Sequence, residues 1–108
     1  MNLQKAITLA EKTAALSNMK FKLGAVLFDD NNYVKGCNTK LYNKSKFSIH
    51  AEEQVIIKAN RITNFDFKNS TLVVVRINKQ GKFRRSYPCS NCQKLINKME
   101  IRIVYYIG

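Results

Sequence analysis

Four residues in two short motifs carry side chains that could form one reactive centre. His50 and Glu52 are two positions apart, and Cys89 and Cys92 are three positions apart in a Pro-Cys-x-x-Cys segment. An imidazole and two thiolates are typical zinc ligands, and a catalytic zinc site keeps three protein ligands with an open position for water. Glu52 is then a free carboxylate that could carry protons. The sequence therefore predicts a catalytic zinc site with His50, Cys89 and Cys92 as ligands.

The spacing of these residues suits the starts of two helices. Cys89 and Cys92 begin an expected helix over residues 89–99, where positions three apart share a face, so that both sulfurs can reach one metal. His50 stands at the start of an expected helix over residues 51–60. Because the positive end of a helix favours anions, we expect both helix starts to stabilise the anionic ligands of the metal.

Other interpretations of the same residues have to be weighed. A lone Cys-x-x-Cys can be a redox pair or half of a zinc knuckle, and a fourth ligand from Cys37 or Glu52 would close the site into a structural one. A redox pair usually lies early in a thioredoxin-like chain, whereas this pair lies late. The two motifs together are rarer than either alone, which favours the catalytic site. We interpret Cys37 as a small buried hydrophobic residue on a strand.

Hydrophobic periodicity predicts helices and strands in the order α-β-β-α-β-α-β. The first two strands should form an antiparallel hairpin, and the last two a parallel pair joined through a helix, so the sheet would be mixed. The run Thr71-Leu72-Val73-Val74-Val75 fits a strand that is covered on both faces. The expected helices cover residues 2–16, 51–60 and 89–99, and the expected strands residues 23–28, 33–37, 71–75 and 101–107.

Composition limits the class of protein. A chain of 108 residues, 45% of them hydrophobic, should form a single domain over residues 1–108. The net charge of +12, from 19 Lys plus Arg against 7 Asp plus Glu, favours anionic partners, although part of it could be compositional drift on a solvated surface. No apolar run approaches the length of a membrane span, so we expect no membrane partner. The odd cysteine count and the lack of an apolar signal region indicate a reducing, cytoplasmic location.

These motifs resemble the cytidine deaminase superfamily, in which H-x-E is followed by P-C-x-x-C. The resemblance covers nearly the whole chain, through the segments 23–27, 36–38 and 103–106 as well as the two motifs. It implies a three-layer α-β-α cytidine deaminase-like fold of the α/β class, with a mixed sheet in which the four main strands have the order 2-1-3-4. It further implies a single zinc-dependent deaminase domain that is short at its C-terminus.

The resemblance also implies a role for individual residues. Zinc would be the cofactor, held by the three predicted ligands, and zinc-bound hydroxide would attack the carbon that carries the amino group of the base. Glu52 would be the proton shuttle in this hydrolytic deamination. Asn38 would contact the ribose of the substrate, and the backbone N–H of Ala51 would contact the pyrimidine carbonyl.

Two departures from the family pattern lead to further expectations. The stretch between Glu52 and Pro88 is long, which predicts an extended hairpin or flap over residues 79–87. The sequence also ends at Gly108, just after the fourth strand, where relatives continue with elements that complete the substrate pocket. We therefore expect a homo-oligomer in which another subunit supplies that wall.

Three kinds of function remain open. The first is a nucleobase deaminase of free cytosine nucleosides or nucleotides. The second is a deaminase of cytosine or adenine in single-stranded DNA, RNA or tRNA, supported by the charge and by Phe47, Phe83 and Tyr87 among basic residues, although these aromatics could equally pack the loops. The third is a non-catalytic, zinc-stabilised binding module, against which Glu52 argues. The candidate contacts to phosphate or nucleic acid are Lys44, Lys46, Arg84 and Arg85.

Overall fold

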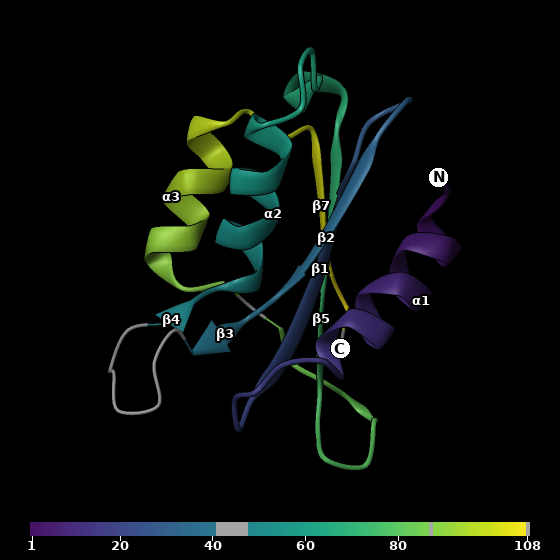
Figure 1. Ribbon diagram of the computed structural model, residues 1–108, viewed down its shortest axis with the longest axis vertical. Helices are drawn as coiled ribbons and strands as arrows, with labels where there is room; N and C mark the ends of the chain where they lie inside the picture. The colour runs from purple at the N-terminus through teal and green to yellow at the C-terminus, as the bar shows by residue number, and fades with distance from the viewer. Residues whose placement is uncertain (41–47, 87, 108) are drawn as a thin grey trace.

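Helices cover both faces of one mixed β-sheet in the computed structural model, which describes residues 1–40, 48–86 and 88–107 (Figure 1). In chain order the elements are α1 (Leu3–Ala14), β1 (Lys22–Phe28), β2 (Tyr33–Cys37), β3 (Thr39–Lys40), β4 (Ser48–Ile49), α2 (Ala51–Asn60), the 3-10 helix η1 (Phe67–Asn69), β5 (Thr71–Ile77), β6 (Phe83–Arg84), α3 (Ser90–Lys98) and β7 (Ile103–Ile107). Helix α1 covers one face of the sheet, and α2 and α3 cover the other (Figure 1).

The strands run in the order β2-β1-β5-β7, which confirms the predicted order 2-1-3-4. β1 pairs antiparallel with β2 and with β5, whereas β7 lies parallel to β5. The short strand β6 pairs antiparallel with the last residues of β5, so the expected hairpin after β5 is present. Of the residues described, no helix is long and apolar enough to cross a bilayer.

Strand β5 is the centre of the core because its two faces are both covered. Val73 and Val75 pack with the alanines of α1, while Leu72 and Val74 pack with residues of α2 and α3. All four side chains are fully buried. A strand covered on both faces needs apolar residues at every position, and this explains the unbroken run in the sequence.

Helix α1 lies very close to β1 because its inner face consists of small residues. Ala6, Ala10 and Ala14 are fully buried there, and Gly24 of β1 faces the last two of them. A Cβ atom at Gly24 would lie 2.0 Å from the backbone oxygen of Ala10. The glycine is therefore required by the close approach of two backbones.

Several expected boundaries differ in the structure by one or two residues. The first helix ends at Ala14 rather than at residue 16, because the following residues form turn hydrogen bonds, such as that from the Ser17 N–H to the Ala14 carbonyl. The final strand starts at Ile103 rather than at residue 101. The segment between β2 and α2, for which no strand was predicted, contains the β3–β4 ladder. The predicted contact residues Lys44 and Lys46 and the aromatics Phe47 and Tyr87 lie outside the described residues.

Candidate active site

The candidate zinc ligands occupy the starts of two neighbouring helices. His50 is the N-cap residue of α2, and its backbone N–H donates to Oε1 of Glu53 at 3.1 Å. Cys89 is the N-cap residue of α3, and its sulfur accepts a hydrogen bond from the N–H of Cys92 at 3.4 Å. Both N-cap residues have extended backbone angles, which turn their side chains across the helix ends.

The structure brings the three predicted ligands together. Nδ1 of His50 lies 3.3 Å from Sγ of Cys92 and 3.6 Å from Sγ of Cys89, and all three ligand atoms lie within 4.8 Å of one another. Tetrahedral zinc, with bonds of about 2.1 Å to nitrogen and 2.3 Å to sulfur, would separate such atoms by about 3.6 Å. Both the donor types and their separations therefore fit zinc.

Neither alternative fourth ligand joins this cluster among the described residues. Cys37 lies on β2, half-buried, with its sulfur 3.7 Å from Oγ1 of Thr39. Glu52 lies near the ligands but does not belong to the group whose donor atoms meet. Three donors leave a tetrahedral metal with an open position, which is the arrangement of a catalytic site.

The surroundings of Cys92 link its ionisation to a cation. Burial raises the pKa of the Cys92 thiol well above its usual range, and the charges of Glu52 and the neighbouring Cys89 raise it further. A buried thiol with these neighbours favours its neutral form until a positive charge is present. A bound metal ion supplies that charge and favours the thiolate, so metal binding and proton release are coupled here.

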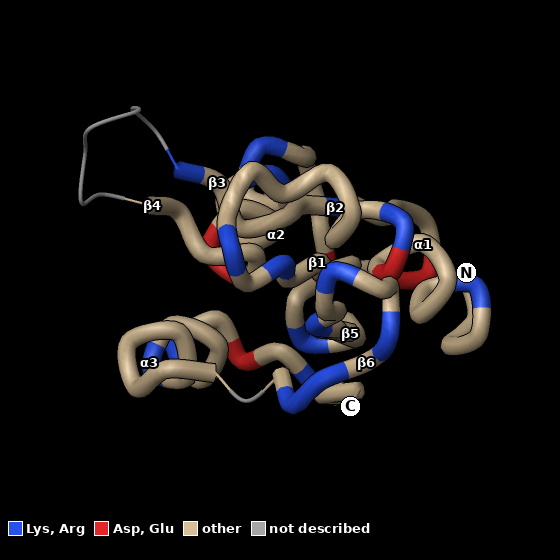
Figure 2. Tube along the Cα trace, turned by 90° about the horizontal axis from the view of Figure 1, so that it is seen from below, with Lys and Arg blue, Asp and Glu red and all other residues tan. Residues whose placement is uncertain are grey.

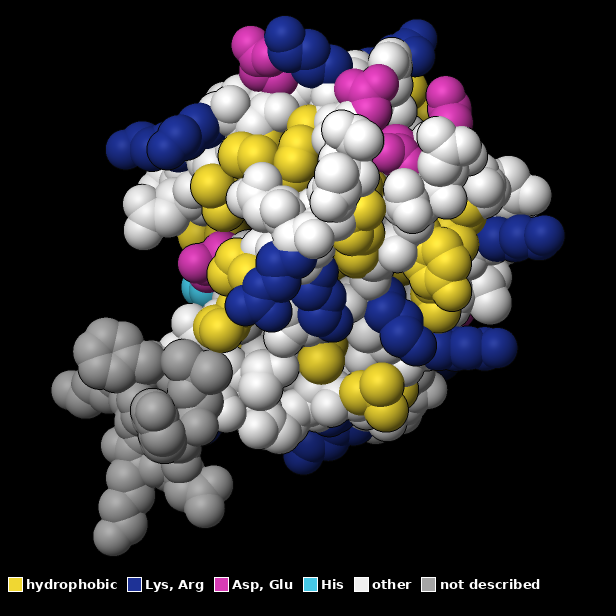
Figure 3. Space-filling model, turned by 45° about the horizontal axis from the view of Figure 1, so that its top comes forward, with side chains coloured by type: hydrophobic (Ala, Val, Ile, Leu, Met, Phe, Trp, Pro, Cys, Tyr) yellow, Lys and Arg dark blue, Asp and Glu magenta, His cyan; other side chains and the backbone are white. Residues whose placement is uncertain are grey.

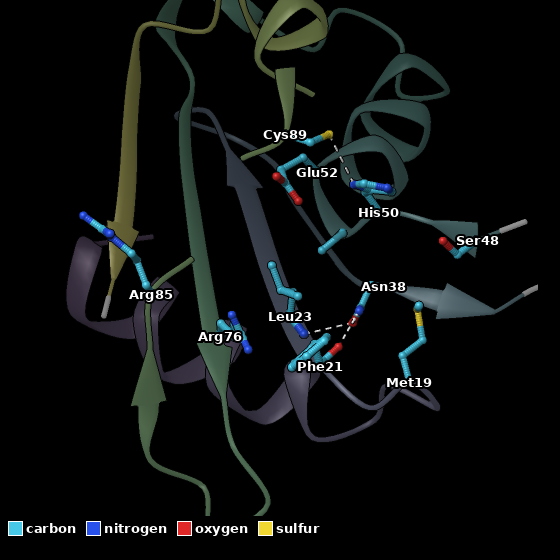
Figure 4. Close-up of a pocket in the computed structure, with 11 residues that line it drawn as sticks. Met19, Phe21, Leu23, Asn38, Ser48, His50, Glu52, Arg76, Arg85 and Cys89 are labelled. Atoms are coloured by element: carbon cyan, nitrogen blue, oxygen red, sulfur yellow. Dashed lines mark hydrogen bonds between the residues drawn. The ribbon is translucent and has the colours of Figure 1, made fainter. Parts of the chain in front are cut away.

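Glu52 is a buried carboxyl group at the wall of the pocket. Its side chain is 2% exposed, and it points into the pocket beside His50 and Cys89 (Figure 4). Burial raises the pKa of Glu52, while its own backbone N–H and the electrostatic effect of His50 partly offset that rise. A carboxyl group whose pKa is raised toward neutrality is suited to accepting and returning protons.

A cavity of about 290 Å³ opens in front of these residues, at the small end of the range for ligand sites. Helix starts, strand ends and a loop all contribute to it. Its lining residues are Met19, Phe21, Leu23, Asn38, Ser48, His50, Ala51, Glu52, Arg76, Arg85 and Cys89 (Figure 4).

Some of the other predicted site residues line the cavity, and others do not. Asn38, Ala51 and Arg85 line the cavity, whereas Arg84 lies exposed on β6 and is not part of its lining. Asn38 is 7% exposed: its Oδ1 accepts from the N–H of Leu23 at 2.9 Å, and its Nδ2 donates to the carbonyl of Phe21 at 2.6 Å. This side chain therefore holds the start of β1 in place, with one N–H and one lone pair left for a ligand.

Neither Arg76 nor Ser86 was predicted from the sequence. Arg76 lines the cavity with its guanidinium group 4.4 Å from the centre of the Phe21 ring. Ser86 is buried, with its hydroxyl 3.2 Å from the Val74 carbonyl and 3.0 Å from that of Ile107, so it anchors the segment that leads to Cys89. The one available signal was the charge of Arg76 in an otherwise apolar strand.

Comparisons with known proteins agree with this geometry. The family model for the cytidine and deoxycytidylate deaminase zinc-binding region matches residues 1–107. No curated protein sequence matches the chain closely enough to count as a relative.

Solved structures of deaminases share the fold. The cytidine deaminase from Burkholderia pseudomallei superposes with a TM-score of 0.74 at 19% identity, over 93% of this chain and 78% of that one. The dCMP deaminase from the cyanophage S-TIM5, solved in complex with dCMP and dUMP, superposes with a TM-score of 0.73 at 20% identity, over 97% of this chain and 82% of that one. The cytidine deaminase from Mycobacterium tuberculosis superposes with a TM-score of 0.68 at 17% identity, over 96% of this chain and 84% of that one.

Proposed function

The chain belongs to the cytidine and deoxycytidylate deaminase zinc-binding family, and we therefore propose that it is a zinc-dependent hydrolase that deaminates cytosine in a free nucleoside or nucleotide. The observation that carries this proposal is the meeting of His50, Cys89 and Cys92 beside the buried carboxyl group of Glu52. In the reaction, water replaces the amino group of the base, and the products are the uracil base and ammonia.

The imidazole of His50 and the thiolates of Cys89 and Cys92 would hold the metal. Zinc, when bound, would supply the Lewis acidity that makes water a good nucleophile near neutral pH. The positive ends of α2 and α3 would stabilise the thiolates, since Cys89 caps α3, Cys92 lies in its first turn and His50 caps α2. The exposed side of His50 and Cys89 leaves the centre accessible from the cavity.

Glu52 would move the protons of the reaction. Its carboxylate oxygen takes a proton from the attacking water and delivers it to the ring nitrogen next to the reacting carbon. It then takes the remaining proton of that water and passes it to the amino group, which leaves as ammonia. Burial supports this role because it raises the pKa of the carboxyl group toward the pH at which it must both accept and donate.

Two further residues would orient the substrate. Ala51 is the first residue of α2, so the helix itself does not use its backbone N–H, which can donate to the pyrimidine carbonyl. The remaining donor and acceptor of Asn38 suit a hydroxyl group of the sugar. Both residues line the same cavity as Glu52, which supports these assignments.

The alternative substrate is a base within single-stranded DNA, RNA or tRNA. It is favoured by the net charge of +12 and by Phe83, which is 40% exposed beside Arg84. On the face in Figure 3, basic side chains lie in a row across the middle and in separate groups toward the edges. A long strand needs a positive groove along its backbone, whereas the cavity of about 290 Å³ in front of Glu52 supports a small substrate.

We also propose that the protein assembles as a homo-oligomer. The supporting observation is the partly exposed apolar surface of β7, where Ile103 is 37% and Tyr105 38% exposed. A second subunit seated near this strand would cover those side chains. Light scattering after size exclusion would test this, and a folded monomer at assay concentrations would contradict it.

The test of the deaminase proposal uses the zinc-loaded protein with cytidine, deoxycytidine, dCMP, single-stranded DNA and RNA, and tRNA. Ammonia release and base change are measured for the parent protein and for Glu52→Gln and Glu100→Gln. We expect Glu52→Gln to keep one zinc per chain and to lose turnover by about a hundredfold or more. Glu100→Gln is the matched control, since this exposed carboxylate pairs with Lys68 on the surface. Full activity of Glu52→Gln, or no turnover of any substrate, would refute the proposal.

A further inference from the structure

We infer that Arg76 recognises a phosphate group on the sugar of the substrate, which makes it a specificity-determining residue of the pocket; this inference rests on the proposed function. In Figure 4, Glu52 and His50 lie at one end of the cavity, Arg76 and Phe21 at the other, and Asn38 between them. A nucleotide has the same linear order of base, sugar and phosphate. With its base at Glu52, its sugar phosphate would point toward Arg76.

The guanidinium group of Arg76 is held against the ring of Phe21. Its Cζ lies over the ring of Phe21, 4.4 Å from the ring centre, which is the distance of a cation–π contact. A guanidinium group carries five N–H donors in a fixed planar fork, and a cation–π contact does not consume them all. A planar fork that is already ordered binds phosphate with two parallel hydrogen bonds and loses little conformational freedom.

No Asp or Glu side chain of the chain neutralises the charge of Arg76. All seven Asp and Glu residues of the chain lie within the described residues, and Arg76 forms no ion pair with any of them. Its side chain is only half-buried, so solvent and ligand can both reach it. A phosphate group would supply the missing anionic partner.

The surroundings of Arg76 are also positive. A second cavity of about 170 Å³ shares Phe21 and Arg76 with the active-site cavity, and its lining includes Lys20, Lys79 and Arg84 but no acidic residue. These residues belong to the turn before β1 and to the β5–β6 hairpin, where basic residues recur along the chain (Figure 2). The positive electrostatic field of these basic residues would attract a phosphate dianion to the Arg76 end of the pocket.

The test measures binding of deoxycytidine, dCMP and a single-stranded oligonucleotide with one cytosine to zinc-loaded Glu52→Gln protein. The same titrations are made with Arg76→Gln, Arg76→Lys and Arg61→Gln added to it. We expect dCMP to bind at least tenfold more tightly than deoxycytidine. Arg76→Gln should reduce this preference by about ten- to a hundredfold, and Arg76→Lys should reduce it less, because it keeps the charge but loses the fork. Arg61→Gln is the matched control, at the exposed C-terminal end of α2.

The possible outcomes separate this inference from the deaminase proposal. The role of Arg76 would be overturned if dCMP bound no more tightly than deoxycytidine. It would also be overturned if both Arg76 variants kept the full preference of the protein with Arg76, even where the parent protein releases ammonia. A preference that depends on Arg76 in a protein without ammonia release would support the phosphate site and refute deamination. Tighter binding of the oligonucleotide, also dependent on Arg76 and steeply weakened by salt, would identify a strand as the source of the phosphate. Zinc content and thermal unfolding establish that each variant is folded.

Discussion

The sulfur of Cys92 lies 3.3 Å from Nδ1 of His50, although 42 positions separate the two residues. One belongs to the first turn of α3 and the other caps α2, and both helices pack on the same face of the sheet (Figure 1). A metal ion at this contact would join two helices whose own packing otherwise depends on the core beneath them. The stability of the fold should therefore depend on the metal.

Cys92→Ser should remove the gain in stability that zinc gives to the parent protein. At free zinc one hundred times its dissociation constant, that gain is about 2.7 kcal/mol in the free energy of unfolding. Thermal and urea unfolding with and without zinc would measure it. Cys37→Ser is the matched control, because its thiol lies outside the ligand cluster and the gain should persist. An equal gain from zinc in Cys92→Ser would show that this thiol is not a ligand.

Gly24→Ala should destabilise the fold by about 3 kcal/mol or more. The added Cβ would lie 2.0 Å from the oxygen of Ala10 and 2.6 Å from the nitrogen of Ala14, and both are backbone atoms that can move only with the whole helix. Overpacking of this kind costs more than a side-chain rearrangement, since α1 must leave its place on the sheet. Urea unfolding of the variant would measure the loss.

Gly81→Ala is the comparison for that experiment. Its Cβ would meet nothing within 4 Å, but its φ of +77° lies in the left-handed region, so we expect a cost of about 1–2 kcal/mol. A Gly24→Ala variant no less stable than Gly81→Ala would mean that α1 lies farther from β1 than the structure indicates.

Much of the site could be predicted because its residues are close in sequence within each motif. The spacings of His50 with Glu52 and of Cys89 with Cys92 pointed to the residues that the structure brings together as the candidate ligands and proton carrier. The unbroken apolar run of β5 likewise predicts a strand that is buried on both faces. The pairing of this strand with the hairpin and with β7 follows from the order of the elements along the chain. In these places, local sequence carries the information that the fold uses.

The other features of the site could not be predicted, because they depend on contacts between segments that are distant in the sequence. Arg76 becomes part of the pocket only because β5 pairs with β1, which brings its side chain over Phe21. The buried hydroxyl of Ser86 can form its two hydrogen bonds only because β5 and β7 lie side by side. The hydrogen bonds of Asn38 to the start of β1 depend in the same way on the antiparallel hairpin, and none of these leaves a periodic pattern in the chain.

Asp29 should make part of the stability of the fold depend on acidic pH. Its side chain is 6% exposed, and its Oδ1 accepts from the N–H groups of Asn31 and Asn32 while its Oδ2 accepts from that of Asp66. Burial acts to raise the pKa of Asp29, but these backbone hydrogen bonds outweigh it and hold the pKa below its ordinary value. The ionised carboxylate thus joins the β1–β2 turn to the segment before β5.

The sign of the effect follows from the lowered pKa. A carboxyl group that is more acidic in the folded state stabilises the fold fully above its unfolded pKa of about 3.9, and this contribution is lost as the pH falls through the folded value. Asp29→Asn lacks that titration and loses hydrogen bonds to a charged acceptor, so it should be less stable by about 2 kcal/mol near neutral pH. The difference from the parent should shrink steadily below about pH 4. Urea unfolding across that range, with Asp30→Asn as the exposed neighbouring control, would measure it. A difference that stays constant or grows in acid would show that these backbone groups do not favour the ionised form of Asp29.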